Sequence, residues 1–299
     1  MKLVLIVVLS LLLFSCVRVE NSTGEDALRY IVLAYRYGYG LSKEALEQIA
    51  ESTDYDDEVL AYYEYFRTGS LPKLIETKAW EVYDDRVLNV LKDSLSVDGT
   101  SPATLVDLFD KPVVVSDWNV EEGSARSELI ERVKTLLIDD WKNRGFFYQW
   151  CEKYSIDVNE EDVLHYAEFL AKVCESSSNI KLKRSSQIES GFFAPEVDLS
   201  TVPTELVLAI CYRESRFFPA AFRCEIENET VRAVSIGLGQ ILADVDSLLS
   251  VDGKQDLYTF ELLNLHYFEN LFEAVDLAQI KASVLFCCTM LALLIEKFR

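Results

Sequence analysis

The chain has 299 residues, of which half are hydrophobic and 12% are aromatic, so it can bury a large core and is not globally disordered. Its 50 acidic and 29 basic residues give a net charge of −21 at pH 7. A surface this acidic repels nucleic acid and anionic lipid headgroups, which excludes nucleic acid as a partner.

The N-terminus has the pattern of an export signal. Lys2 supplies a positive charge, and residues 3–13 form an apolar segment that is too short to span a bilayer. The sequence Leu13-Phe14-Ser15-Cys16 that follows resembles the lipobox of bacterial lipoproteins. This resemblance implies that residues 1–15 are removed and that a diacylglycerol group on Cys16 anchors the protein to the bacterial cell envelope, on the periplasmic side or in the outer membrane. The alternative is an ordinary secretory signal in which the cysteine is incidental.

A short tether is expected over residues 16–24, and a domain of paired helices over residues 25–175. Apolar residues recur at spacings of three and four over residues 27–35, 129–141 and 163–174, as they do on one face of a helix. Clusters of Gly, Pro and Ser between these runs indicate turns.

Local signals mark helix starts and give little sign of strands. Ser42 and Asn159 are expected to begin helices, because short polar side chains cap the free amide groups of a first turn. The only strand-like stretch that we identify is Val113–Val115. The predicted fold class is therefore all-α for most of the chain.

Tyrosines are dense in the helical domain, as in the sequence AYYEYF at residues 61–66. They indicate either core packing, with hydroxyl groups at its edge, or an aromatic surface for sugars or a partner, and we favour core packing. An acidic, tyrosine-rich helical domain also fits a scaffold for protein partners, which stays open as a second role.

A linker is expected over residues 176–200. Serines gather there around the basic residues Lys181, Lys183 and Arg184, and the helical periodicity stops. The linker would separate the helical domain from a second domain over residues 201–299.

Six cysteines follow Cys16, and none has the spacing of a metal site. Several fall on apolar helix faces, which favours reduced and buried thiols, although an exported protein could oxidise them in pairs. His165 and His266 are the only histidines, so neither a zinc site nor a Ser-His-Asp triad is supported, and no metal or cofactor is predicted. The six residues are Cys151, Cys174, Cys211, Cys224, Cys287 and Cys288.

A helix that begins near Pro203 carries a glutamate at the end of an apolar face. Val207, Ile210 and Cys211 fall on one side of this helix, at spacings of three and four, and Glu214 extends the same stripe. Burial of the stripe would favour the protonated carboxyl group that a general acid needs in order to protonate a glycosidic oxygen.

The sequence SIGLGQI follows at residues 235–241. Its glycines allow a tight turn and a close backbone approach to a ligand, and its glutamine offers a donor and an acceptor to sugar hydroxyl or amide groups. Asp244 and Asp246 come soon after, and we interpret them as a turn or a helix start rather than as a second catalytic acid. The candidate substrate-binding residues are Ser215, Ser235, Gly237, Leu238, Gly239, Gln240 and Ile241.

Together, the motifs LVLAICYRESRFFPAA and SIGLGQI resemble the lytic transglycosylase domain of the soluble, lysozyme-like family. The resemblance covers residues 201–299 and implies a mostly helical, lysozyme-like fold that binds peptidoglycan glycan strands and cleaves the MurNAc–GlcNAc bond. It implies that Glu214 first protonates the leaving oxygen and then, as a base, activates the C6 hydroxyl group that closes a 1,6-anhydro ring. The N-acetyl group of the substrate would assist, so no second carboxylate, metal or cofactor is implied.

The family pattern also contains elements that this sequence does not match. Members carry Pro and Thr soon after the glutamine, where this chain has Leu242 and Ala243, and a Tyr-Asn motif in a later helix, which we do not find before Arg299. The final apolar run, residues 282–295, is predicted to be a buried core helix. Because the Tyr-Asn motif is not found, a catalytically degenerate peptidoglycan-binding lipoprotein is the alternative to an active enzyme.

Overall fold

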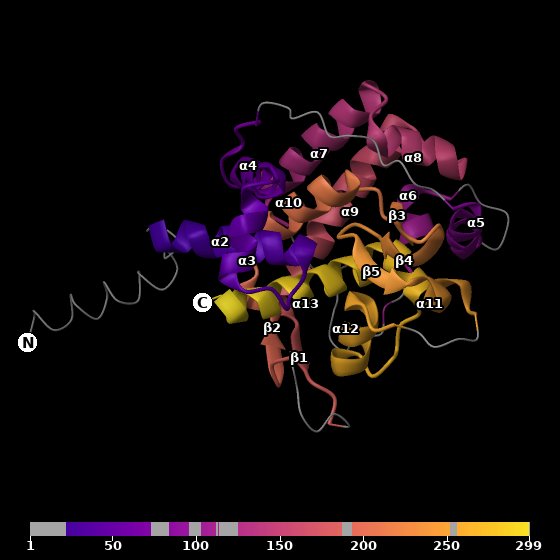
Figure 1. Ribbon diagram of the computed structural model, residues 1–299. Coiled ribbons are helices and arrows are strands. Elements are labelled where there is room, and N and C mark those ends of the chain that lie inside the picture. The colour runs from indigo at the N-terminus through magenta and orange to yellow at the C-terminus, as the bar shows by residue number, and fades with distance from the viewer. Residues whose placement is uncertain are drawn as a thin grey trace, which may run out of the picture. The chain divides into compact units, whose positions relative to one another are not determined.

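The computed structural model describes residues 22–72, 84–95, 103–111, 113, 125–186, 193–251 and 256–298 (Figure 1). Cys16, the predicted signal peptide and most of the Val113–Val115 stretch lie outside these ranges. Within the ranges, helices predominate and the strands form two small antiparallel sheets, which confirms a mostly α-helical chain. No helix among the described residues is long and apolar enough to cross a membrane.

In the described part of the chain, α-helices follow one another up to Ser176, and short 3-10 helices and strands appear between helices after it. The α-helices are α2 (Ser22–Tyr37), α3 (Lys43–Ala50), α4 (Tyr55–Thr68), α5 (Asp85–Ser94), α6 (Leu105–Phe109), α7 (Ser127–Lys142), α8 (Phe146–Tyr154), α9 (Glu160–Ser176), α10 (Thr204–Ser215), α11 (Val245–Leu249), α12 (Thr259–Tyr267) and α13 (Ile280–Phe298). The short 3-10 helices are η1 (Ser177–Asn179), η2 (Leu199–Thr201) and η3 (Ala274–Ala278). The strands are β1 (Lys181–Lys183), β2 (Glu196–Asp198), β3 (Phe222–Glu227), β4 (Thr230–Ile236) and β5 (Ile241–Asp244).

The chain divides into two compact units. One comprises Met1–Asp57 together with Leu294–Arg299, and the other comprises Glu58–Leu293. Residues 176–200, which were predicted to be a linker, lie within the second unit.

In the first unit, α2 and α3 contact each other. Ser42 caps α3, as predicted, because its side chain accepts a hydrogen bond of 3.3 Å from the amide of Ala45. Arg29 of α2 forms ion pairs of 3.0 Å with Asp56 and 2.6 Å with Asp57. Burial raises the pKa of the Asp56 carboxyl group, and the nearby guanidinium partly opposes this effect.

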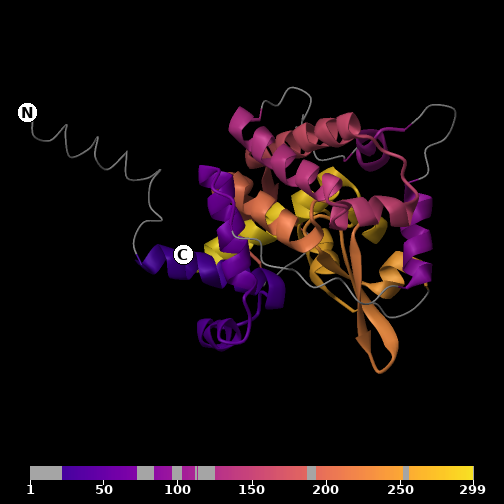
Figure 2. The same cartoon turned by 90° about the horizontal axis from the view of Figure 1, so that it is seen from above.

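In the second unit, α9 contacts both α7 and α10. Figure 2 shows the pink helices α7 to α9 on one side of α10. Asn159 caps α9, as predicted, by accepting a hydrogen bond of 3.0 Å from the amide of Asp162. The predicted apolar faces of residues 129–141 and 163–174 are largely buried, which confirms them as core faces.

A three-stranded antiparallel sheet follows α10, with the strand order β3-β4-β5. Phe222 lies opposite Ile236, which in turn lies opposite Ile241, so these three side chains form one buried row across the sheet. The register shifts at a bulge between Glu225 and Ile226.

This sheet was not predicted. The charged residues of β3, Arg223, Glu225 and Glu227, alternate with the less polar residues Phe222, Cys224 and Ile226. An alternation with a period of two is the signal of a strand. The sequence therefore carries a signal for the first strand of the β3–β4 hairpin, although the alternation is short.

The stretch predicted as a linker contains packed structure. Leu182 of β1 lies opposite Val197 of β2, and both side chains are buried. Tyr267 of α12 donates a hydrogen bond of 2.7 Å to the carbonyl oxygen of Ala194. Serine and lysine content suggested a linker, whereas the apolar residues Leu182 and Val197 allow a strand pair, and the residue Ala194 just before β2 contacts α12.

Helix α13 is buried along nearly all of its length, which confirms the predicted core helix over residues 282–295. The six cysteines after Cys16 are buried and free, in agreement with the interpretation of reduced thiols. Burial raises the pKa of the Cys224 thiol to about 11, so this thiol stays protonated at neutral pH.

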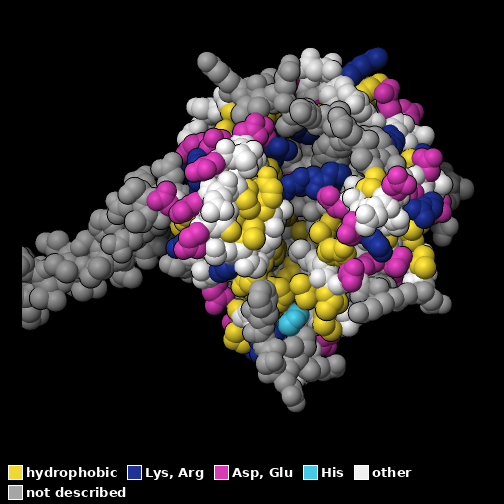
Figure 3. Space-filling model, in the orientation of Figure 1, with side chains coloured by type: hydrophobic (Ala, Val, Ile, Leu, Met, Phe, Trp, Pro, Cys, Tyr) yellow, Lys and Arg dark blue, Asp and Glu magenta, His cyan; other side chains and the backbone are white. Residues whose placement is uncertain are grey.

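Acidic side chains are spread over the visible face in Figure 3, with Lys and Arg side chains between them. Several Lys and Arg side chains of the protein are paired with acids. Lys181 lies 2.8 Å from Asp198 and lowers the pKa of that carboxyl group to about 2. Arg126 lies 2.5 Å from Glu175 and 2.8 Å from Glu205. Pairing therefore offsets part of the negative charge locally.

Candidate active site

Glu214 lies in the last turn of α10, and its side chain is 3% exposed. Val207, Ile210 and Cys211 are buried on the same helix, so the predicted apolar stripe is confirmed. Arg216 ends the helix in a left-handed conformation with a φ of 50°, which turns the chain away from the helix axis. The predicted acid thus sits at the end of a buried, apolar helix.

Ser215 was predicted to bind substrate, but its hydroxyl group turns back toward the helix. It donates a hydrogen bond of 2.8 Å to the carbonyl oxygen of Cys211, and the residue is 2% exposed. Such a bond satisfies a carbonyl group near the end of a helix. The structure therefore gives Ser215 a role in holding the turn that carries Glu214.

Two tyrosines hold the segment that follows α10. Tyr166 of α9 donates a hydrogen bond of 2.5 Å to the carbonyl oxygen of Phe217, and Tyr154 of α8 donates one of 2.7 Å to that of Ala220. Burial raises the pKa of both phenols, so both remain protonated donors. The backbone directly after the candidate acid is therefore fixed by the helical layer.

The loop at residues 237–240 docks onto the same segment. The amide nitrogen of Gly237 and Nε2 of Gln240 each lie 2.9 Å from the carbonyl oxygen of Ala221, and both donate to it. Nε2 of Gln240 also donates to the carbonyl oxygen of Gly237, at 2.9 Å. The structure thus brings together the two motifs that are separate in the sequence.

The two glycines of this loop allow it to approach α13. Gly237 has a φ of 87°, and a Cβ atom there would lie 2.2 Å from the carbonyl oxygen of Leu277 and 2.4 Å from Oγ of Ser283. The amide of Gly239 donates a hydrogen bond of 3.4 Å to the same Ser283 oxygen. The glycines therefore serve close packing onto the core, in addition to any contact with a ligand.

Gln240 is held in a left-handed backbone conformation with a φ of 51°, and its side chain is 8% exposed. Its two donor hydrogens have acceptors, but within the described part of the chain its Oε1 atom has no hydrogen-bond partner. A buried acceptor without a donor costs about 1–3 kcal/mol. A ligand N–H or O–H group could satisfy it.

The other predicted loop residues are buried. Ser235 of β4 is 3% exposed, Leu238 is fully buried, and Ile241 of β5 is 2% exposed. The turn itself therefore comprises residues 237–240, including the buried Leu238, while Ser235 and Ile241 lie in the strands on either side of it.

Two arginines beside Glu214 were not singled out from the sequence. Arg213 pairs with the buried carboxylate of Glu58 on α4. The guanidinium of Arg216 lies 4.5 Å from the ring centroid of Tyr212, and Arg216 donates a hydrogen bond of 3.2 Å to the hydroxyl group of Tyr62. Pairings across more than 150 residues leave no local signal in a sequence.

Several tyrosine hydroxyl groups of the second unit have defined partners. Those of Tyr154, Tyr166 and Tyr267 donate to backbone carbonyl groups, whereas that of Tyr62 accepts from Arg216. The ring of Tyr62 also lies 4.6 Å, between centroids, from that of Tyr212 near the end of α10. Tyr62 is therefore the tyrosine of α4 that reaches the end of the glutamate helix.

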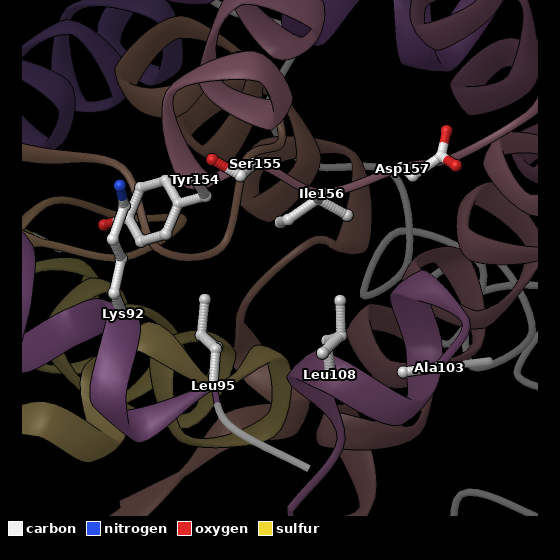
Figure 4. A pocket seen from close by; sticks show the side chains of 8 residues that line it. All are labelled: Lys92, Leu95, Ala103, Leu108, Tyr154, Ser155, Ile156 and Asp157. Carbon is white, nitrogen blue, oxygen red and sulfur yellow. The ribbon is translucent and has the colours of Figure 1, made fainter. Parts of the chain in front are cut away.

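A cavity of about 550 Å³ lies on the other side of Tyr154. Figure 4 shows Leu95 and Leu108 pointing toward the segment that contains Ile156, with Lys92 beside Tyr154. Tyr154 lines this cavity, and its hydroxyl group donates a hydrogen bond to the carbonyl oxygen of Ala220. One side chain therefore connects the cavity to the segment after Glu214.

The acids after the loop are structural, as predicted. Asp244 caps α11 by accepting a hydrogen bond of 2.7 Å from the amide of Asp246, and its second oxygen accepts one of 2.7 Å from Asp256. Across the described ranges, no group of three or more His, Cys, Asp or Glu residues could hold a metal ion.

Comparisons with protein-family models, with curated proteins and with solved structures find no match. The resemblance to lytic transglycosylases therefore depends on the two sequence motifs alone.

Proposed function

We propose that this chain is a peptidoglycan lytic transglycosylase that cleaves the MurNAc–GlcNAc bond and forms 1,6-anhydro-MurNAc. The main support is the pair of hydrogen bonds by which Gly237 and Gln240 hold Ala221. They join the glutamine loop to the segment that follows Glu214, as a shared glycan site requires.

Glu214 acts twice in this reaction. As an acid it donates its proton to the glycosidic oxygen, and as a base it then removes the proton of the C6 hydroxyl group while the anhydro ring closes. Its low exposure supports the first step, because a buried carboxyl group is shielded from bulk water during the proton transfer. Oε1 of Gln240 accepts a hydrogen bond from a substrate amide or hydroxyl group.

The proposal includes an envelope location. The protein is exported and anchored through lipid on Cys16, so that the glycan strands of the cell wall lie within its reach. These features rest on the N-terminal sequence pattern, which lies outside the described residues.

Digestion of purified cell-wall sacculi tests the activity. The mature protein should release anhydro-muropeptides, identified by mass spectrometry, and Glu214→Gln should lower the rate by about 10²–10⁴-fold, the usual contribution of a general acid and base. Glu229→Gln makes the same chemical change at an exposed carboxylate between the two motifs and is the matched control, and both variants are first checked for cooperative thermal unfolding. Equal product yield from wild type and Glu214→Gln would reject the proposal.

A second candidate is a peptidoglycan-binding protein without turnover. It is favoured by the hydroxyl groups of Tyr154, Tyr166 and Tyr267. Each of them donates to a backbone carbonyl oxygen, which is a structural role and not a catalytic one. In this case the wild type and Glu214→Gln would sediment equally with sacculi and neither would release anhydro-muropeptides. Failure of the wild type to sediment would eliminate this candidate.

A further inference from the structure

A second cavity lies on the face formed by α5, α11, α12 and η3. Its volume is about 720 Å³. In this region α5 contacts α11 and η3, and α11 contacts η3. Figure 1 shows α11 and α12 close together, on the side of the sheet opposite to α7. All lining residues belong to the second unit.

Large apolar side chains gather around this cavity in contact with water. Val251 is 50% exposed, Leu257 62%, Leu265 36% and Leu271 68%, and we call these four residues the aliphatic rim. Leu257 and Leu265 line the cavity, and the other two directly follow the lining residues Ser250 and Asn270. Full burial of one such side chain is worth about 1.5–3 kcal/mol, so their exposure in one place favours a surface that becomes covered.

The buried polar groups of the cavity are already satisfied. The carboxylate of Glu261 accepts hydrogen bonds of 2.9 Å from the amide of Asp244, 2.9 Å from the hydroxyl group of Ser247 and 3.1 Å from the amide of Tyr258. The side-chain amide of Asn264 is bonded to both backbone groups of Phe272. A sugar site needs donors and acceptors that can bond to the ligand. Glu261 and Asn264 already bond to the protein, so a ligand here would be bound mainly through apolar contacts.

The charged side chains that line the cavity in the described part of the chain are acidic. These are Glu261 and Glu273, and no described Lys or Arg is among the lining residues. Asp256 directly precedes Leu257, and Glu269 lies two residues before Leu271. This arrangement attracts cations and repels anionic lipid headgroups.

We propose that the aliphatic rim and its cavity dock an amphipathic segment of a partner protein, with apolar side chains in the cavity and Lys or Arg side chains against the acidic surround. Apolar anchors inside a charged margin are the usual composition of such helix-binding grooves. The site is separate from Glu214 and does not depend on the proposed transglycosylase activity.

The test uses the full mature protein and two fluorescent helix-forming peptides. Both peptides carry Leu at positions i, i+3, i+4 and i+7, and they differ only in having Lys or Glu at the other positions. Fluorescence anisotropy should show the Lys peptide binding at least ten-fold more tightly than the Glu peptide. Equal affinity for the two peptides, or no binding of either, would overturn the proposal.

A pair of variants shows where the peptide binds. Leu257→Ser with Leu265→Ser changes no charge and should weaken binding of the Lys peptide at least ten-fold. Leu71→Ser with Ile226→Ser is the matched control, because these side chains are also exposed (60% and 53%) but do not line the cavity. Equal weakening by both double variants would mean that the peptide binds to the acidic surface in general, which contradicts the proposal.

Light scattering during gel filtration provides an independent measurement. The wild type should remain monomeric at the concentrations used for binding. A dimer that disappears in the Leu257→Ser, Leu265→Ser variant would show that a second copy of this chain occupies the surface, and it would overturn the assignment to a partner segment.

Discussion

Glu214 and Gln240 are held in position in different ways. The helix and its buried stripe place Glu214, whereas Gln240 is held by two donated hydrogen bonds and keeps one acceptor atom without a described partner. The Gln240 amide is fixed through Nε2, and its Oε1 atom can still accept a hydrogen bond. A ligand would lose little affinity in ordering this side chain, because folding has already restricted its rotamers.

Tyr62 is the first residue at which we make a prediction about stability. Tyr62→Phe removes one hydrogen-bond acceptor of Arg216, whose side chain is 8% exposed, so we expect a loss of about 1–2 kcal/mol in the free energy of unfolding. Urea unfolding measures it. Tyr63→Phe is the matched control and should cost less, because Tyr63 is less buried than Tyr62.

The Tyr62→Phe variant also tests whether Tyr62 helps to position the end of α10. If it does, the rate of anhydro-muropeptide release should fall more for Tyr62→Phe than for Tyr63→Phe, with binding to sacculi retained. Unchanged rates in both variants would show that the hydroxyl group of Tyr62 has no part in the reaction.

Gly237 is the second residue with a sharp expectation. Gly237→Ala places a methyl group against Leu277 and Ser283 at a positive φ, so steric overlap and backbone strain together should cost about 3 kcal/mol. Gly40→Ala is the matched control, since no atom lies within 4 Å of its Cβ position. Thermal unfolding compares the two, and equal midpoints would contradict the close contact with α13.

At the scale of elements, local chemistry predicted helix starts well. Ser42, Asn159 and Pro203 each stand at the start of a helix, because capping and φ restriction act within one turn. The β3–β4 hairpin was missed, since its alternation is short and is interrupted by a bulge after Glu225.

Helix α8 provides a prediction about pH. Asp140 of α7 accepts a hydrogen bond of 3.2 Å from the amide of Tyr148 in the first turn of α8, and burial nevertheless raises the pKa of Asp140 to about 6. The folded protein therefore binds this proton more tightly than the unfolded chain, whose Asp pKa is about 4. It follows that the free energy of unfolding decreases as the pH rises from about 4 to about 6.

Asp140→Asn removes this titration. The stability of the wild type relative to Asp140→Asn should therefore be greatest near pH 4 and should decrease up to pH 6, as measured by urea unfolding at several pH values. A constant difference between the two proteins across this range would show that Asp140 titrates normally.

At the scale of the whole molecule, pairings distant in sequence were the least predictable features. The contacts of Arg213 with Glu58 and of Arg216 with Tyr62 depend on the fold and leave no periodicity. By contrast, the hydrophobic content correctly predicted a large core, and the helical periodicity correctly predicted a mostly helical chain. Both signals are reliable because they are summed over many residues.

The net charge of −21 leads to a prediction about salt. Like charges repel one another more strongly in the compact state, and the Debye length falls from about 30 Å at 0.01 M to about 8 Å at 0.15 M ionic strength. The midpoint of thermal unfolding should therefore rise by a few degrees over this range of sodium chloride. A lower midpoint in salt would mean that attractive pairs, such as Lys181 with Asp198, outweigh the repulsion.

The contact between the glutamine loop and α13 also has a consequence in time. Gly239 and Ser283 are 44 residues apart in the sequence. The hydrogen bond between the loop and Ser283 can therefore form only once α13 has folded against the loop. Each local opening of α13 then releases the loop while α10 can remain helical. The amide hydrogen of Gly239 should therefore exchange with solvent deuterium at the rate of the amides around Ser283, and more slowly than those of an ordinary surface turn.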